Sequence, residues 1–115
     1  MDIKHLQKYL QDFADQRNWN PYHNPKNLAM ALAGESGELL EIFQWLTPEE
    51  SSRTGLGPKN RLAVRDEIAD IFIYTLRLAD VLDIDLEKAF WDKMKKNDMK
   101  YPSDQEQERS GGFNR

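Results

Sequence analysis

The stretch from Leu62 to Leu82 constrains the fold most, because its apolar residues cover more than one face of the helix that it would form. A helix on the surface of a monomer carries a single apolar stripe, whereas a helix that is apolar nearly all round must be covered on several sides. The chain has 115 residues, which at roughly 100–200 residues per domain is enough for one domain. Because so few other helices are available as cover, we expect an obligate homo-oligomer, a dimer or a tetramer.

Four segments have helical periodicity and none shows sustained alternation with a period of two, so the sequence predicts an all-α fold. Asn24 followed by Pro25 is a typical helix start, Asp85 is a candidate N-cap, and Thr47-Pro48-Glu49-Glu50 resembles a capping box that opens one short turn. The expected helices span residues 3–17, 25–46, 58–82 and 86–99. We expect one domain over residues 1–102 and a flexible polar C-terminal tail over residues 103–115.

Composition narrows the classes of function. The sequence holds 20 acidic residues against 16 Lys and Arg and has a formal charge of −4, which argues against a general nucleic-acid binder because such proteins need a positive surface. Cysteine is absent, which excludes disulfides, a thiolate nucleophile and Cys-ligated metals. The N-terminus lacks the apolar run of a signal peptide, and no segment is apolar for long enough to span a membrane. We therefore expect a cytoplasmic protein without a nucleic-acid or membrane partner.

Two pairs of acidic residues are the candidate chemical site. Glu35 and Glu38 lie on the second expected helix, and Glu67 and Asp70 lie on the third. The i,i+3 spacing places both carboxylates of a pair on one helix face, and apolar residues flank each pair. Four carboxylates on two facing, partly buried helices would repel one another strongly. Divalent cations relieve that repulsion, and all-oxygen ligands favour hard ions such as Mg²⁺ or Mn²⁺.

Two other interpretations compete with this one. Acid pairs at this spacing are common on solvated helix faces, so a non-catalytic helical module that binds a nucleotide or another protein stays open. A ferritin-like di-iron bundle also gathers glutamates on helices, but it requires Glu-x-x-His pairs. The two histidines, His5 and His23, do not follow a Glu at that spacing, which argues against the di-iron class.

The acid motifs, taken with several other residues, resemble a known family. Glu35-x-x-Glu38, followed 32 residues after Glu35 by Glu67-x-x-Asp70, is similar to the all-α nucleoside triphosphate pyrophosphohydrolases of the MazG type and to their dCTP pyrophosphatase-like branch. The resemblance covers about residues 3 to 102. The supporting residues are Phe13, Arg17, Trp19, His23, Pro25-Lys26-Asn27-Leu28, Ala31-Leu32, Gly34, Gly37, Leu39, Phe43-Gln44-Trp45, Tyr74, Lys93-x-x-x-Asn97 and Tyr101-Pro102.

The resemblance implies a four-to-five-helix MazG-like bundle that homo-oligomerisation completes. It also implies Mg²⁺-dependent cleavage of a (d)NTP between the α- and β-phosphates, giving a (d)NMP and pyrophosphate in nucleotide-pool housecleaning. The closest branch favours dCTP or a modified dCTP. Glu35, Glu38, Glu67 and Asp70 would be the catalytic carboxylates and the Mg²⁺ ligands, with Mn²⁺ as a substitute. Which carboxylate takes the proton of the attacking water stays open, and Glu41, one turn further along, is as readily a solvated acid.

Substrate-binding candidates fall into two groups. By resemblance, Lys93 and Asn97 would contact the phosphates, although Lys93 also fits an ordinary basic face together with its neighbouring lysines; Arg17 and Lys26 are weaker candidates. Base recognition needs a flat apolar slot with a few hydrogen-bonding groups. The candidates for that slot are Trp19, Trp45 and Tyr74, with His23 and Asn27 near them in the chain. We assign the third tryptophan, Trp91, to the core.

Overall fold

Helices account for the regular structure of residues 1–103, which are the residues that the computed structural model describes. No strand occurs among them, so the predicted all-α class is confirmed for this part of the chain. The helices are α1 (Ile3–Gln16), α2 (Pro25–Phe43), α3 (Pro58–Val81) and α4 (Leu86–Lys100), with a short 3₁₀ turn, η1, at Asn20–Tyr22. Helix α2 ends three residues earlier than expected. Nearly all of the predicted tail lies outside the described residues.

Side-chain caps fix where the helices begin. Asp2, Asn24 and Asp85 each accept a hydrogen bond from the backbone N–H three residues further on, at 3.1, 2.9 and 3.0 Å. Each bond satisfies one of the N–H groups that the first helical turn leaves without a partner. Pro25 and Pro58 occupy the first positions of α2 and α3, where the missing N–H costs nothing. The N-caps predicted at Asn24 and Asp85 are confirmed.

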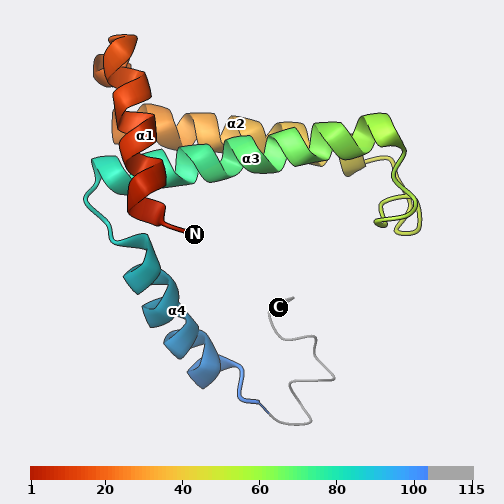
Figure 1. Ribbon diagram of the computed structural model, residues 1–115. Helices are drawn as coiled ribbons and strands as arrows, with labels where there is room; N and C mark the ends of the chain where they lie inside the picture. The colour runs from red at the N-terminus through yellow and green to blue at the C-terminus, as the bar shows by residue number, and fades with distance from the viewer. Residues whose placement is uncertain (104–115) are drawn as a thin grey trace. The chain divides into compact units, whose positions relative to one another are not determined.

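Helices α2 and α3 lie side by side in antiparallel directions, and α1 crosses the pair near the C-terminal end of α3 (Figure 1). Ala14 of α1, Leu28 of α2, and Leu76 and Ala79 of α3 form the fully buried part of the core. Gln7 of α1 is also buried, and its Nε2 donates to the backbone carbonyl of Leu76 at 3.0 Å. These contacts hold α1 against α3.

The connector from α2 to α3 is ordered at its start by a reciprocal pair of hydrogen bonds. The Thr47 N–H donates to Oε1 of Glu50 at 2.8 Å, and the Glu50 N–H donates to Oγ1 of Thr47 at 3.2 Å. This is the capping box that the sequence predicts. It stabilises the single turn that redirects the chain after α2.

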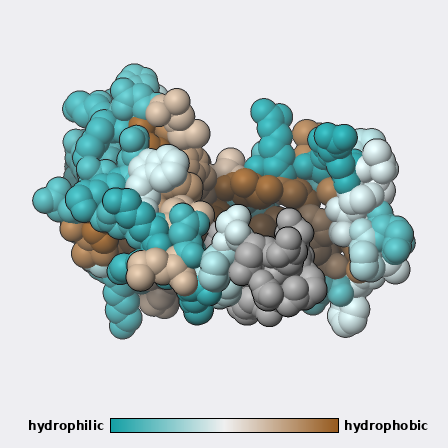
Figure 2. All heavy atoms as spheres, turned by 90° about the horizontal axis from the view of Figure 1, so that it is seen from below, coloured by the Kyte–Doolittle hydropathy of each residue, from teal (hydrophilic) through white to brown (hydrophobic). Residues whose placement is uncertain are grey.

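Apolar side chains of α3 are incompletely covered within the chain. Leu62 is 59% exposed, Ile68 53% and Phe72 37%, and apolar surface of this kind is visible in brown in Figure 2. The other helices of residues 1–83 therefore leave part of α3 uncovered, as its all-round apolar pattern suggests. None of the described helices is long and apolar enough to cross a membrane.

Residues 84–103 form a second unit, which contains α4. Trp91 packs edge-on against Phe90, with the ring centroids 4.9 Å apart, and is 59% exposed. Its assignment to the core is therefore wrong for the single chain, in which Phe90 is its aromatic neighbour.

Candidate active site

The antiparallel pair α2 and α3 brings acids from two parts of the sequence together. Glu35 and Glu38 of α2 and Glu67 of α3 each place one carboxylate oxygen within 4.8 Å of the others. One turn after Glu67, Asp70 lies close enough for its charge to act on both Glu35 and Glu67. We call these four residues the acid cluster.

In two members of the acid cluster, one carboxylate oxygen is buried without a hydrogen-bond partner among the described residues. These are the Oε2 atoms of Glu35 and Glu67. Burial raises the pKa of Glu35 to about 7, aided by the carboxyl groups of Glu67 and Glu38 and by the charge of Asp70. Burial also raises the pKa of Glu67, and Glu38 and Asp70 act in the same direction. The protein alone thus disfavours the fully ionised cluster.

This donor set fits a hard divalent cation. Carboxylate oxygens are the ligands that such ions prefer, and a cation would supply the partner that the buried oxygens of Glu35 and Glu67 lack. Glu41, one turn further along α2, is exposed and is not part of the group of oxygens within 4.8 Å.

A pocket of about 260 Å³ lies beside the acid cluster. Asp70 belongs to both, because it lines the pocket and its charge acts on Glu35 and Glu67. The pocket draws its other lining residues from α1, the loop after it and α3: Tyr9, Leu10, Phe13, Trp19, His23, Ile73, Tyr74 and Arg77. Aromatic rings with a few polar groups are typical of a site for a flat ligand.

The aromatic side of this pocket is internally packed. Phe13 and Trp19 meet edge to face with centroids 5.6 Å apart, and Trp19 lies 5.8 Å from the ring of His23. The guanidinium of Arg17 lies 3.4 Å from the centroid of Phe13. Arg17, a weak phosphate candidate in the sequence, therefore contacts an aromatic ring of the pocket wall.

The structure brings together only some of the predicted substrate-binding residues. Trp19, His23 and Tyr74 line the pocket. Trp45 is 86% exposed beyond the end of α2 and does not line it. The Asn27 side chain donates to the Tyr22 carbonyl at 3.1 Å, which ties α2 to the preceding loop.

The two predicted phosphate contacts, Lys93 and Asn97, belong to the unit of residues 84–103. Asn97 is half-buried on α4, and its amide nitrogen lies 3.7 Å from Sδ of Met94. Lys93 is exposed on the same helix. Their role stays a prediction.

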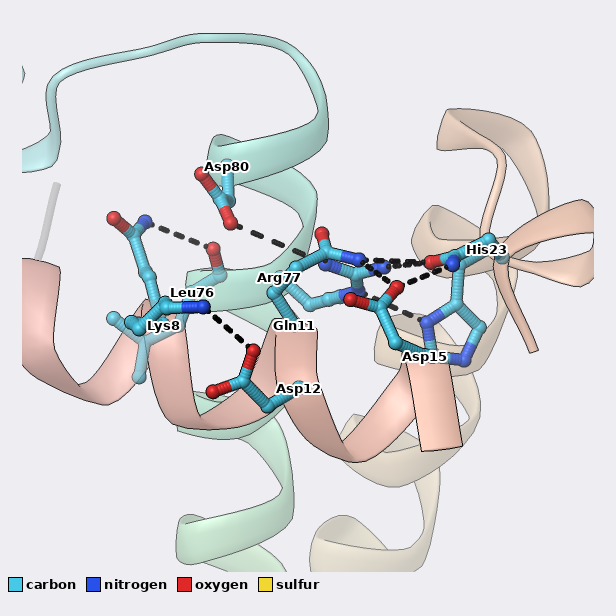
Figure 3. Close-up of polar contacts among 10 residues, drawn as sticks. Lys8, Gln11, Asp12, Asp15, His23, Leu76, Arg77 and Asp80 are labelled. Atoms are coloured by element: carbon cyan, nitrogen blue, oxygen red, sulfur yellow. Dashed lines mark hydrogen bonds and ion pairs between the residues drawn. The ribbon is translucent and has the colours of Figure 1, made fainter. Parts of the chain in front are cut away.

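Arg77 is the residue that the sequence analysis missed. It is only 4% exposed, lines the pocket and hydrogen-bonds to three side chains (Figure 3). A signal was present in the sequence, since Arg77 is the one charged residue in the otherwise apolar or uncharged run from Ile71 to Ala79. Lys and Arg are almost never fully buried unless they are paired, so an arginine at that place predicts a polar network.

Comparison with known proteins adds the family to this geometry. A profile of the MazG-like family matches residues 32–114, which include the whole acid cluster. The chain belongs to the MazG-like family. The family predicted from the acid motifs is therefore confirmed.

Individual relatives agree with this assignment. The MazG-like chain is 41% identical over 102 residues to dCTP pyrophosphatase 1 of Homo sapiens, which is 89% of this chain and 58% of that protein. It is 42% identical over 101 residues to dCTP pyrophosphatase 1 of Bos taurus, 88% of this chain and 58% of that protein. The chain thus spans just over half the length of these relatives.

A solved structure shares the fold. The crystal structure of a pyrophosphatase from Archaeoglobus fulgidus matches with a TM-score of 0.79 at 43% sequence identity. The match covers 87% of this chain and 92% of that one. The all-α arrangement is therefore found in a related protein along nearly its whole length.

Proposed function

We propose that this MazG-like chain is a Mg²⁺-dependent nucleoside triphosphate pyrophosphohydrolase. It cleaves a (d)NTP between the α- and β-phosphates and releases a (d)NMP and pyrophosphate. The observation that carries the proposal is the junction at Asp70, where a cluster of carboxylates with unpartnered buried oxygens meets an aromatic pocket. That junction suits a ligand with a charged, metal-dependent end and a flat aromatic end.

Bridging cations would allow the acid cluster to bind a polyanion. A triphosphate would be repelled by Glu35, Glu38, Glu67 and Asp70 unless cations bridge the two. These four carboxylates would hold Mg²⁺, or Mn²⁺ in its place. When bound, the metal lowers the pKa of water and neutralises phosphate charge. The chain's own carboxylates set where that charge is neutralised, and the pocket orients the base beside it.

The nucleotide is proposed to be dCTP or a modified dCTP, as the names of the relatives suggest. Trp19 and Tyr74 supply aromatic surface for the base, and His23 supplies a polar group. Lys93 and Asn97 of α4 are proposed to contact the phosphates, with Trp45 and Asn27 as further substrate-binding candidates. The cellular role that we propose is removal of unwanted nucleotides in the cytoplasm.

We also propose that the bundle is completed by homo-oligomerisation, as a dimer or a tetramer. Exposed apolar side chains on α3 support this, as does an apolar depression of about 670 Å³ at the start of the helix. Its lining includes Leu56, Leu62, Val64 and Ile68. Burial of such a surface in a second subunit is the ordinary source of stability in obligate oligomers.

The decisive experiment is an assay for released pyrophosphate with Mg²⁺ across canonical and modified (d)NTPs. We expect turnover that disappears with EDTA and in the double variant Glu38→Gln/Asp70→Asn. Glu41→Gln is the matched control, because it removes an exposed carboxylate one turn from the cluster, and it should keep its turnover. Full turnover in the double variant would refute the assigned site. If nucleotides bind but none of them yields pyrophosphate, the chain is a non-catalytic module instead.

A further inference from the structure

Arg77 places a guanidinium in the interior of the first unit, at the wall of the aromatic pocket. Its Nε donates to Nδ1 of His23 at 3.0 Å, one terminal nitrogen donates to Oε1 of Gln11 at 2.6 Å, and the other donates to Oδ1 of Asn20 at 2.9 Å. The side chain is only 5% exposed. Helix α1, the following loop and α3 thus converge on one cation (Figure 3).

These partners occupy three of the five N–H donors of the guanidinium. A guanidinium has five N–H groups and no acceptor. Three of its donors are engaged by His23, Gln11 and Asn20, and Oδ2 of Asp80 lies 3.9 Å from a terminal nitrogen. Asp15 reinforces the network from outside, because it accepts hydrogen bonds from Gln11 at 2.8 Å and from Asn20 at 2.6 Å. The geometry therefore assigns Arg77 to holding other side chains.

The contact with His23 determines where the imidazole carries its proton. Arg77 can only donate, so Nδ1 of His23 must accept and cannot bear a hydrogen. A neutral imidazole then carries its single proton on Nε2. Protonation of Nδ1 would set two N–H groups and two positive charges against each other. Burial lowers the pKa of His23, and the Arg77 charge acts in the same direction.

We propose that Arg77 is a positioning residue that holds His23 as a neutral Nε2–H donor in the wall of the pocket. The pocket thereby favours a base whose edge presents an acceptor, a carbonyl oxygen or an unprotonated ring nitrogen. The ionisable groups around this donor are Arg77 and Asp80 of α3, Asp15 of α1, and the pocket residues Asp70, Tyr74 and Tyr9. The identity of the ligand rests on the proposed nucleotide function, whereas the state of His23 does not.

The state of His23 can be tested without any substrate, by ¹⁵N NMR of the imidazoles in the full chain. The sequence has only two histidines, and His5→Gln assigns the spectrum. We expect His23 to be the Nε2–H tautomer at neutral pH. In Arg77→Met the two tautomers should mix and the pKa of His23 should rise toward 6.5, its ordinary value. Asp80→Asn, which keeps the contact between Arg77 and His23, should leave the tautomer unchanged.

A wild-type protein with the Nδ1–H form, or an Arg77→Met variant with an unchanged tautomer, would overturn the proposal. Arg77→Met leaves Oε1 of Gln11 without its donor and is at risk of unfolding. Arg77→Lys is the second variant, because it keeps a buried cation but lacks the planar fork that reaches three acceptors. Its ammonium group also only donates, so a lysine that reaches Nδ1 keeps the Nε2–H tautomer, and an Nδ1–H form in Arg77→Lys would count against the proposal equally.

Kinetics with the nucleotide that the pyrophosphate assay selects supply the second test. Loss of one oriented hydrogen bond corresponds to about a tenfold rise in KM, so Arg77→Met should raise KM by that factor and leave kcat almost unchanged. In a His23→Phe background the same change should have no further effect, because Arg77 acts through His23. Additive losses, or a fall in kcat alone, would show that Arg77 does not act through His23. If no nucleotide is hydrolysed at all, the proposed function fails while the NMR result still decides the link between Arg77 and His23.

Discussion

Two clusters of polar side chains include residues of α3, and they are built in opposite ways. At Glu67, the protein gathers carboxylates of like charge from α2 and α3 and leaves buried oxygens of Glu35 and Glu67 without partners. Ten residues further on, almost three turns of helix, Arg77 is buried with three hydrogen-bonding side chains around it. One helix therefore carries an incomplete cluster and a complete one.

This difference distinguishes a ligand-binding site from a network that holds other side chains in place. Buried polar groups are normally satisfied, and an exception calls for an explanation. The partners of Arg77 come from the chain itself, so this network can hold other groups in place. The buried oxygens of Glu35 and Glu67 have no such partners among the described residues, and under the proposed function a metal ion would supply the missing counter-charge.

The strongest test of that contrast removes one carboxylate of the incomplete cluster. Glu35→Gln should lower kcat/KM by more than about a hundredfold, because the loss of a metal ligand should exceed the roughly 10–100-fold loss typical of a residue that only supports one. The same variant should melt higher than wild type in EDTA, since it relieves repulsion. Glu41→Gln is the control and should change neither value. Turnover near the wild-type level in Glu35→Gln would show that the acid cluster is a surface feature.

The pH dependence of stability tests the missing counter-charge directly. The folded-state pKa of Glu35 is raised from 4.5 to about 7, so its contribution to stability is fully present below pH 4.5 and is lost as the pH rises through 7. In EDTA, the melting temperature of the wild type should fall over that interval. Excess Mg²⁺ should raise it by several degrees at the alkaline end and hardly at all at the acidic end.

Melting curves across this pH range, with EDTA and with Mg²⁺, measure both effects. Glu35→Gln should flatten the fall in EDTA. A Mg²⁺ effect of the same size at both ends of the range would mean that the ion binds elsewhere.

Local rules were sufficient to predict most of the fold. The caps at Asn24 and Asp85 and the box from Thr47 to Glu50 depend on residues three positions apart, so the sequence displays them directly. The i,i+3 acid pairs are equally local. Predicting that the two acid pairs meet across α2 and α3 requires one further assumption, that both apolar flanks face the same interior.

Features that depend on distant residues were harder to predict. Arg77 meets His23 across 54 positions of sequence and Gln11 across 66, and no local pattern pairs an arginine with neutral acceptors. From the sequence, Trp45 is a candidate for binding the base. The end of α2 at Phe43 instead leaves it beyond the helix and exposed. Exposure of Trp91 likewise depends on what packs against α4.

The space around α2 beside the acid cluster is open, and a substitution of Gly37 tests this. A Cβ added at Gly37, beside Glu38 on α2, would meet nothing within 4 Å. Gly37→Ala should therefore stabilise the single chain by about 0.5–1 kcal/mol, the usual gain from replacing a helical glycine. Denaturant unfolding measures this, with Gly34→Ala as the matched control on the same helix. Destabilisation by Gly37→Ala would show that a second subunit packs closely against α2, so that this surrounding is not open in solution.

The smallest expected effect comes from His23 in the Arg77 network. Its contribution to stability changes with pH in the direction opposite to that of Glu35. The folded-state pKa of His23 lies below its ordinary value of 6.5 because of burial and then the Arg77 charge. Its contribution to stability is therefore present above pH 6.5 and is lost as the pH falls through the lowered folded-state value. The acid cluster gains stability over part of that interval, so the two contributions partly cancel in the wild type. Removing the larger contribution with Glu35→Gln should expose a small fall in melting temperature on acidification.

That fall should disappear when His23→Phe is added but persist when His5→Gln is added, because His5 is exposed and lies outside the Arg77 network. A fall that persists without His23 would assign the acid sensitivity to another group.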